Sequence, residues 1–144
     1  MPVNVSALRV ELLTDPKGLG YSTFVTFRDL NRLVDLLNTK GLTSEVVSVG
    51  TITSMDLQAN VVGSEYVALT ASQRNLWDVV IFTGTGGIAI SNANVRGQIT
   101  TVWSAATTTR ANLVALQNRP ASRAEVLFGE NTTIQTGEVD QATR

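Results

Sequence analysis

The sequence predicts a mainly α-helical protein, a compact bundle of about seven short helices with a small β-sheet of two or three short strands. Apolar residues recur at helical spacing in several segments, and two capping boxes mark helix starts. Three short β-branched stretches supply the expected strands. A length of 144 residues fits one domain. We expect residues 1–41 to form an N-terminal helical hairpin and residues 42–144 a helical body that carries the strands.

The hairpin is predicted from two bounded helical patterns. The first begins near Val5 and must end by Asp15-Pro16, because proline restricts the residue before it and cannot donate a backbone hydrogen bond. After a glycine turn, Thr26 is the expected cap of the second helix. That helix should end at Lys40-Gly41, where a last-turn cation is followed by a glycine suited to the left-handed conformation.

Three β-branched stretches each lead into a hydroxyl residue and then into a helical segment. Each hydroxyl can accept a hydrogen bond from the first turn of the next helix, which stabilises it by about 1 kcal/mol. The three strands could pair into a small sheet. Alternatively, the pattern arises because hydroxyl residues often follow β-branched ones in a Thr-rich chain. The stretches are residues 50–54, 87–91 and 132–136, with Ser54, Ser91 and Thr136 as the expected caps.

Further helices lie between and after these stretches. Thr70 and Ser122 each open a capping box, with Gln73 and Glu125 three residues later. Another helix is expected after Ser91, and one more runs from the threonines at 107–109 towards Arg119-Pro120. Together with the hairpin, these segments make up the helical bundle.

The composition excludes several classes of function. The chain has no His and no Cys, so it can form no disulfide, Cys/His zinc site, thiolate nucleophile or imidazole base. A net charge of -1 gives no electrostatic reason to bind nucleic acid or an anionic membrane. We find no secretory signal, and the longest apolar run, residues 79–82, is far too short to span a bilayer. We therefore expect no catalytic residue, no cofactor and no metal.

The low charge content points towards an assembly. Only 16% of the residues are charged, against about 25% in ordinary soluble domains. A surface poor in Lys and Glu is typical of proteins whose surface is covered by neighbouring subunits. The alternative is a lightly charged monomer.

The segment from Asp78 to Gly87 allows two interpretations. It could be a buried strand that leads into a glycine-rich loop, Gly84 to Gly87, whose N–H groups cradle a phosphate. It then resembles the glycine loop of molybdopterin-binding domains, which would imply a cofactor-binding domain. The order Thr-Gly-Thr-Gly-Gly differs from that family's Thr-Thr-Gly-Gly-Thr-Gly, and Ser91-Asn92 replaces its acidic residue. Alternatively, residues 76–82 continue the helix that starts at Thr70 and the glycines end it.

Five residues are candidates for contact with a partner. Arg110, Arg119 and Arg123 could bind acidic groups in a bidentate manner, or could instead form ion pairs with Glu125 and Glu130.

Tyr21 and Phe24 follow the glycine turn and could form an aromatic anchor on an exposed loop. Alternatively, both fold back and close the open end of the first two helices. The carboxylates offer no comparable site, because no sequence feature brings two of them together.

Three stretches of the chain resemble a family of small virion structural proteins of tailed bacteriophages. They are residues 12–21 (LLTDPKGLGY) with 36–38, residues 64–74 (SEYVALTASQR), and residues 109–125 (TRANLVALQNRPASRAE) with 128–129.

The resemblance implies a virion component of the capsid, the head-to-tail neck or the tail, made in the host cytoplasm. Such a component would bind other virion proteins and copies of itself, and the family supplies no catalytic residues. A monomeric regulatory binding module remains the alternative beside the glycine-loop domain.

Overall fold

The computed structural model describes residues 2–83 and 87–144. Within these ranges the chain forms ten helices and one two-stranded sheet. The predicted mainly α-helical class is therefore confirmed, whereas the expected number of about seven helices is wrong.

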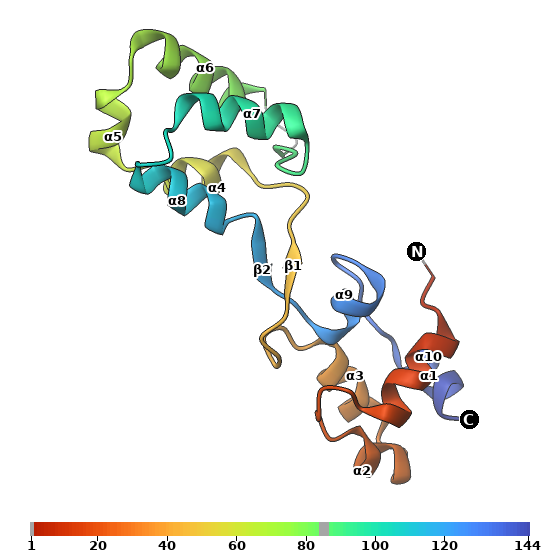
Figure 1. Cartoon of the computed structure of the whole chain (residues 1–144). Helices are drawn as coiled ribbons and strands as arrows, with labels where there is room; N and C mark the ends of the chain where they lie inside the picture. The colour runs from red at the N-terminus through yellow and green to blue at the C-terminus, as the bar shows by residue number, and fades with distance from the viewer. Residues whose placement is uncertain (1, 84–86) are drawn as a thin grey trace. The chain divides into compact units, whose positions relative to one another are not determined.

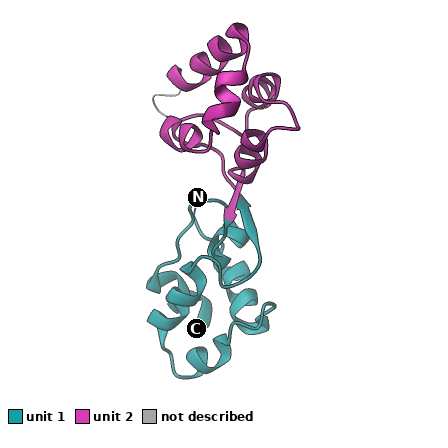
Figure 2. Cartoon of the chain, turned by 90° about the vertical axis from the view of Figure 1, so that its left-hand side faces the viewer, with its two compact units in different colours: residues 1–47, 120–144 teal, residues 48–119 magenta. Residues whose placement is uncertain are grey.

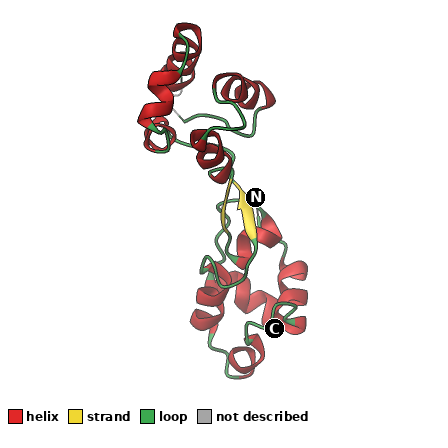
Figure 3. Ribbon diagram, turned by 60° about the vertical axis from the view of Figure 1, so that its left-hand side comes forward, coloured by secondary structure: helices red, strands yellow, loops and turns green. Residues whose placement is uncertain are grey.

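The chain divides into two compact units (Figure 2). Unit 1 combines the N-terminal segment up to Val47 with residues 120–144, and unit 2 is the continuous segment Ser48–Arg119. Both crossings between the units fall in the sheet, where β1 (Val46–Ser48) pairs antiparallel with β2 (Asn118–Pro120), drawn in yellow in Figure 3. The C-terminal residues 120–144 thus belong to the same compact unit as the N-terminal helices.

Unit 1 contains five helices around one apolar core. In Figure 1, α1 and α10 lie side by side, and α3 contacts both α9 and α10. Leu8, Leu33, Leu37, Ile134 and Val139 are completely buried in its core. The helices are α1 (Val5–Thr14), α2 (Tyr21–Thr26), α3 (Leu30–Asn38), α9 (Arg123–Phe128) and α10 (Thr136–Thr143).

The first helix has the predicted bounds, and the turn after it is organised by an acidic side chain. Asp15 adopts a left-handed conformation with a φ of 42° at the end of α1. Its carboxylate accepts hydrogen bonds of 2.7 Å from the backbone N–H groups of Leu19 and Gly20. These bonds fix the glycine turn that the sequence predicts.

The second half of the hairpin differs from the prediction. Thr26 is the last residue of α2, a short helix that the sequence analysis missed, and it does not cap the next helix. Asp29 caps α3 instead, because its carboxylate accepts a 3.1 Å hydrogen bond from the N–H of Arg32. α3 ends earlier than predicted, at Asn38, and its C-cap Thr39 is extended. Gly41 has the expected left-handed conformation, with a φ of +78°, but lies three residues beyond the helix and does not end it.

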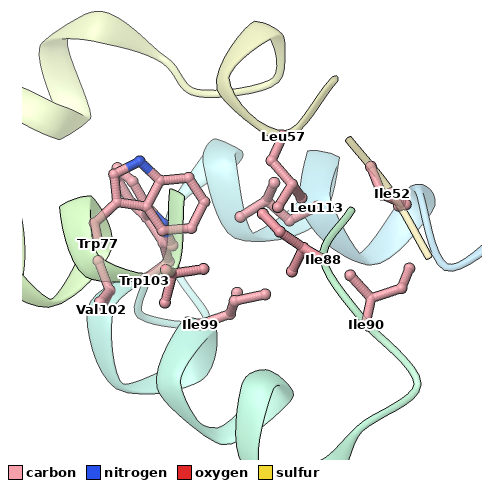
Figure 4. Close-up of a cluster of buried hydrophobic side chains, with 10 residues drawn as sticks. Ile52, Leu57, Trp77, Ile88, Ile90, Ile99, Val102, Trp103 and Leu113 are labelled. Carbon is pink, nitrogen blue, oxygen red and sulfur yellow. The ribbon is translucent and has the colours of Figure 1, made fainter. Parts of the chain in front are cut away.

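Unit 2 contains the other five helices and both tryptophans. The Trp77 and Trp103 rings meet edge to face, with 5.4 Å between their centroids, and both are completely buried (Figure 4). α6 and α7 lie side by side (Figure 1). Its helices are α4 (Ser54–Ala59), α5 (Gly63–Ala68), α6 (Ala71–Phe82), α7 (Ala93–Val102) and α8 (Thr108–Ala115).

Both predicted capping boxes are present. Thr70 accepts a 3.2 Å hydrogen bond from the N–H of Gln73, and the Gln73 side chain accepts one of 2.9 Å from the N–H of Thr70. Ser122 and Glu125 form the same reciprocal pair at the start of α9. These local signals depend on no distant contact, which explains why the sequence analysis located them.

The three expected strands do not form a sheet. Two of the stretches meet in an isolated antiparallel bridge, in which Ile52 and Ile88 exchange backbone hydrogen bonds of 2.9 and 2.6 Å. In the third stretch the side chain of Asn38 donates to the carbonyl of Ile134 and accepts from its N–H. An amide side chain therefore takes the place of a neighbouring strand there.

The predicted caps of these stretches are each displaced by one residue. Thr53 caps α4 by accepting from the N–H of Asp56 at 3.1 Å, while Ser54 is the first helical residue. Asn92, and not Ser91, caps α7.

Ser91 and Thr136, the other two expected caps, also do not cap their helices. The Ser91 hydroxyl lies 3.3 Å from the carbonyl of Gly50, and Thr136 is the first residue of α10, after the N-cap Gln135. The hydroxyl pattern identified the helix starts, and the structure corrects the residue that caps each one.

The corrected caps give a prediction for stability. Thr53→Ala should lower the free energy of unfolding of unit 2 by about 0.5–2 kcal/mol, because the N–H of Asp56 loses its acceptor. Thr136→Ala removes an exposed hydroxyl and should change stability by less than about 0.5 kcal/mol. Urea titration checks both, with tryptophan fluorescence following unit 2 and circular dichroism following the helices of both units. Equal losses in the two variants would contradict the corrected assignment.

Candidate functional site

Arg123, the first residue of α9, lies in a buried ion cluster within unit 1. Its Nε and Nη2 donate to the two carboxylate oxygens of Glu11 at 2.6 and 3.0 Å. Its Nη1 contacts both carboxylate oxygens of Glu45 at 3.0 and 2.9 Å. Only 9% of Arg123 and 3% of Glu11 are exposed. The guanidinium expected to contact an acidic partner is therefore held by two carboxylates of its own chain.

Two further side chains complete the ion cluster. Lys17 Nζ lies 3.0 Å from Glu45, and the Tyr21 hydroxyl donates to Glu11 at 3.2 Å. Burial, and then the neighbouring Glu11, raises the pKa of Tyr21. Burial alone would raise the pKa of Glu45, but hydrogen bonds from Lys17 and Arg123 outweigh it and hold that pKa below its ordinary value. The tyrosine thus stays protonated and the glutamate ionised near neutral pH.

The ion cluster has the geometry of a structural element. It joins α1 and α9 to the segment before β1 through hydrogen bonds that occupy the oxygens of both carboxylates. The hydrogen bond to Glu11 is the main cause that raises the pKa of Arg123. A permanently charged guanidinium between two carboxylates offers no group that gives or takes a proton near pH 7.

The expected exposed aromatic pair is corrected by the packing of α2. Tyr21 is completely buried in the core of unit 1, because its ring packs among the apolar helices and its hydroxyl bonds to Glu11. Phe24 is half-buried against the same core, with the guanidinium carbon of Arg32 6.0 Å from its ring centroid. The alternative, in which the aromatic side chains fold back onto the helices, matches the position of Tyr21.

The other two candidate arginines lie in unit 2. Arg110 is half-buried and donates from Nη1 to the carbonyl of Trp103 at 2.7 Å. Arg119 is half-buried beside a recess that Asp56 and Asn60 also line. The structure therefore does not bring Arg110 and Arg119 into the ion cluster of Arg123 in unit 1.

Glu65 accepts hydrogen bonds from the start of α8, a helix that is distant from it in the sequence. Its carboxylate accepts from the N–H groups of Thr108 and Thr109 at 2.8 and 2.7 Å and from the Thr109 hydroxyl at 2.7 Å. These bonds, that of the Thr109 hydroxyl first, lower the pKa of Glu65. The described ranges contain no group of three or more acidic residues suited to hold a metal ion.

The interpretation of residues 78–82 as a strand is wrong, because α6 continues through Phe82. Residues 84–86 of the proposed phosphate loop lie outside the residues that the structure describes. Gly87 is described, and its φ of +106° is one that side chains rarely adopt. A Cβ at this position would collide with Cγ2 of Thr51, so packing beside the Ile52–Ile88 bridge accounts for this glycine.

Sequence reasoning missed an apolar patch on unit 2. Met55, Val79 and Phe82 are exposed to 80%, 53% and 77%, and we call these three residues the α4–α6 patch. The Ser54 hydroxyl donates to the carbonyl of Ile81 at 2.9 Å, which brings the start of α4 to the end of α6. The available signal was the i, i+3 spacing of Val79 and Phe82 opposite the buried Trp77 and Val80.

Comparisons of this chain with protein-family models, with curated proteins and with solved structures found no match. Within residues 2–83 and 87–144, no helix has the length and apolar character needed to cross a membrane.

Proposed function

We propose that the chain is a structural component of a tailed-phage virion, associated with the capsid or the head-to-tail neck. It acts through contacts with other virion proteins and with copies of itself. The resemblance of residues 12–21, 64–74 and 109–125 to small virion proteins supports the assignment to a particle. The charged groups at the centre of unit 1 bind one another, which supports a structural role for them within that unit.

The observation that carries the proposal is the α4–α6 patch. Large apolar side chains that are mostly exposed and lie on adjoining helix ends are a feature of interaction surfaces. Methionine and aromatic residues are enriched at protein interfaces, while Lys and Glu are depleted. The patch has this composition, in a chain of which only 16% is charged.

The proposal is tested by replacing Met55 and Phe82 together with serine. Because both side chains are largely exposed, the variant should fold and melt as the unmodified chain does. Loss of two interface anchors should lower incorporation into particles by about tenfold, the change expected from 1.4 kcal/mol of binding energy. The measurement is the ratio of variant to unmodified chain in purified particles, relative to their ratio in the lysate.

Val67→Ser supplies the matched control. Val67 is 72% exposed on α5, outside the patch, so its loss should leave incorporation unchanged. If the double variant folds and enters particles as efficiently as this control, the α4–α6 patch is not the contact surface.

A further inference from the structure

Unit 2 also has a surface recess that differs in chemistry from the apolar α4–α6 patch. A recess between α7 and α8 has an apolar floor that includes Ile90, Ile99 and Leu113. All three are buried members of the core, and Figure 4 shows them in the same cluster. Arg96 and Arg110 line the same recess. An apolar floor beside two guanidinium groups suits a ligand that has both an apolar and an anionic part.

The charge around this recess is not balanced by the chain itself. Among the residues that the structure describes, no Asp or Glu lines the recess. Within the part of the chain that the structure describes, neither Arg96 nor Arg110 forms an ion pair. Arg96 is exposed, while Arg110 is held in place by its hydrogen bond to the Trp103 carbonyl. A guanidinium has five N–H donors, so Arg110 keeps donors for an anion.

A polar recess adjoins the apolar one. The two recesses share Ile90, Arg96 and Gln117, and the polar recess, of about 310 Å3, is also lined by Ser48, Ser91 and Asn118. Arg96 therefore stands between a small apolar recess of about 30 Å3 and this larger polar recess, which has room for polar backbone. This succession matches a peptide better than a compact small molecule.

We propose that this recess binds an acidic peptide segment of another virion protein. Carboxylates of the segment bind Arg96 and Arg110, and an aliphatic side chain between them covers the rim of the small apolar recess at Val114, which is 48% exposed. The proposal rests on the function proposed above and names the chemistry of one partner. A nucleic acid fits less well, because phosphate binding draws on many clustered cations, whereas this site combines two arginines with an apolar floor.

The test uses the full chain, labelled with 15N, and the probe peptide N-acetyl-Glu-Leu-Glu-amide. We expect saturable NMR shifts of the amides of Ile90, Ile99 and Leu113. The matched peptide N-acetyl-Gln-Leu-Gln-amide should bind more weakly, because it lacks the carboxylates. Arg96→Gln should weaken binding of the acidic peptide about two- to fivefold, as expected for an exposed ion pair.

Two further variants separate local contact from general charge. Arg74→Gln removes the same charge from α6, away from the residues of this recess, and should leave the affinity unchanged. Val114→Glu places a carboxylate at the rim, where Val114 is 48% exposed, and should weaken binding more than Arg96→Gln does.

The inference is overturned if the acidic peptide causes no saturable shift, or if the glutamine peptide binds equally well. It is also overturned if a dT12 oligonucleotide, but not the peptide, shifts the same amides in an Arg96-dependent manner. A chain that binds the peptide but is absent from particles would contradict the virion role and keep the acidic-peptide site. A chain that is present in particles but does not bind the peptide would contradict the acidic-peptide site and keep the virion role.

Discussion

Replacing Arg123 with methionine is expected to lower the free energy of unfolding of unit 1 by about 3–5 kcal/mol, the usual cost of removing one partner of a buried ion pair. Glu11 is 3% exposed, so its carboxylate would be left buried without its cation. Methionine keeps most of the apolar length of arginine, so the loss measures the charge more than the packing. Urea unfolding followed by circular dichroism measures the change.

Two matched variants test whether the unpaired charge of Glu11 causes this loss of stability. Adding Glu11→Gln to Arg123→Met should recover about 1 kcal/mol or more, because the unpaired charge disappears while Tyr21 keeps an acceptor. Arg144→Met breaks the exposed pair with Asp140, in which 71% of the arginine side chain is exposed, and should cost far less stability than Arg123→Met does. A loss below about 1 kcal/mol in Arg123→Met would show that the cluster is not a buried, fully paired network.

Gly87→Ala is expected to destabilise unit 2 by about 1–3 kcal/mol from backbone strain, with about 1–3 kcal/mol more from overpacking. The strain arises from the φ of +106°, and the overpacking from the collision of the new Cβ with Cγ2 of Thr51. Tryptophan fluorescence during urea unfolding reports the change, because both tryptophans lie in unit 2.

The collision can be separated from the strain. Thr51→Ser removes Cγ2. Adding this substitution to Gly87→Ala should therefore recover the stability that the collision costs, while the loss from backbone strain remains. Gly97→Ala is the control, because Gly97 is helical with nothing within 4 Å of its Cβ position, and alanine there should stabilise α7 by about 0.5–1 kcal/mol. A Gly87→Ala variant as stable as the unmodified chain would contradict the packing role of this glycine.

The parts of the fold that depend on local signals were predicted from the sequence. Pro16 sets the end of α1, and the boxes at Thr70 and Ser122 start their helices where expected. The six-residue α2 was missed because fewer than two helical turns do not show a repeating apolar face. The strands β1 and β2 were missed because three residues give no alternating pattern and their pairing joins distant segments.

The ion cluster could be predicted only in part. Arg123 was singled out, but its partners lie 112 and 78 residues away in the sequence. One signal was available, because Glu11 lies three residues after Leu8 and beside Leu12 on the apolar face of α1. A carboxylate on a core-facing position requires a buried cation. Which cation meets it depends on the tertiary fold, and no local pattern encodes that choice.

Quantitative mass spectrometry of gradient-purified phage particles determines whether this chain is a virion component. We expect peptides of the chain at a fixed copy number per particle, because a structural component occupies a defined set of symmetric positions. The copy number should stay constant across gradient fractions and through a high-salt wash. A chain that is abundant in the lysate but absent from purified particles would contradict the virion role.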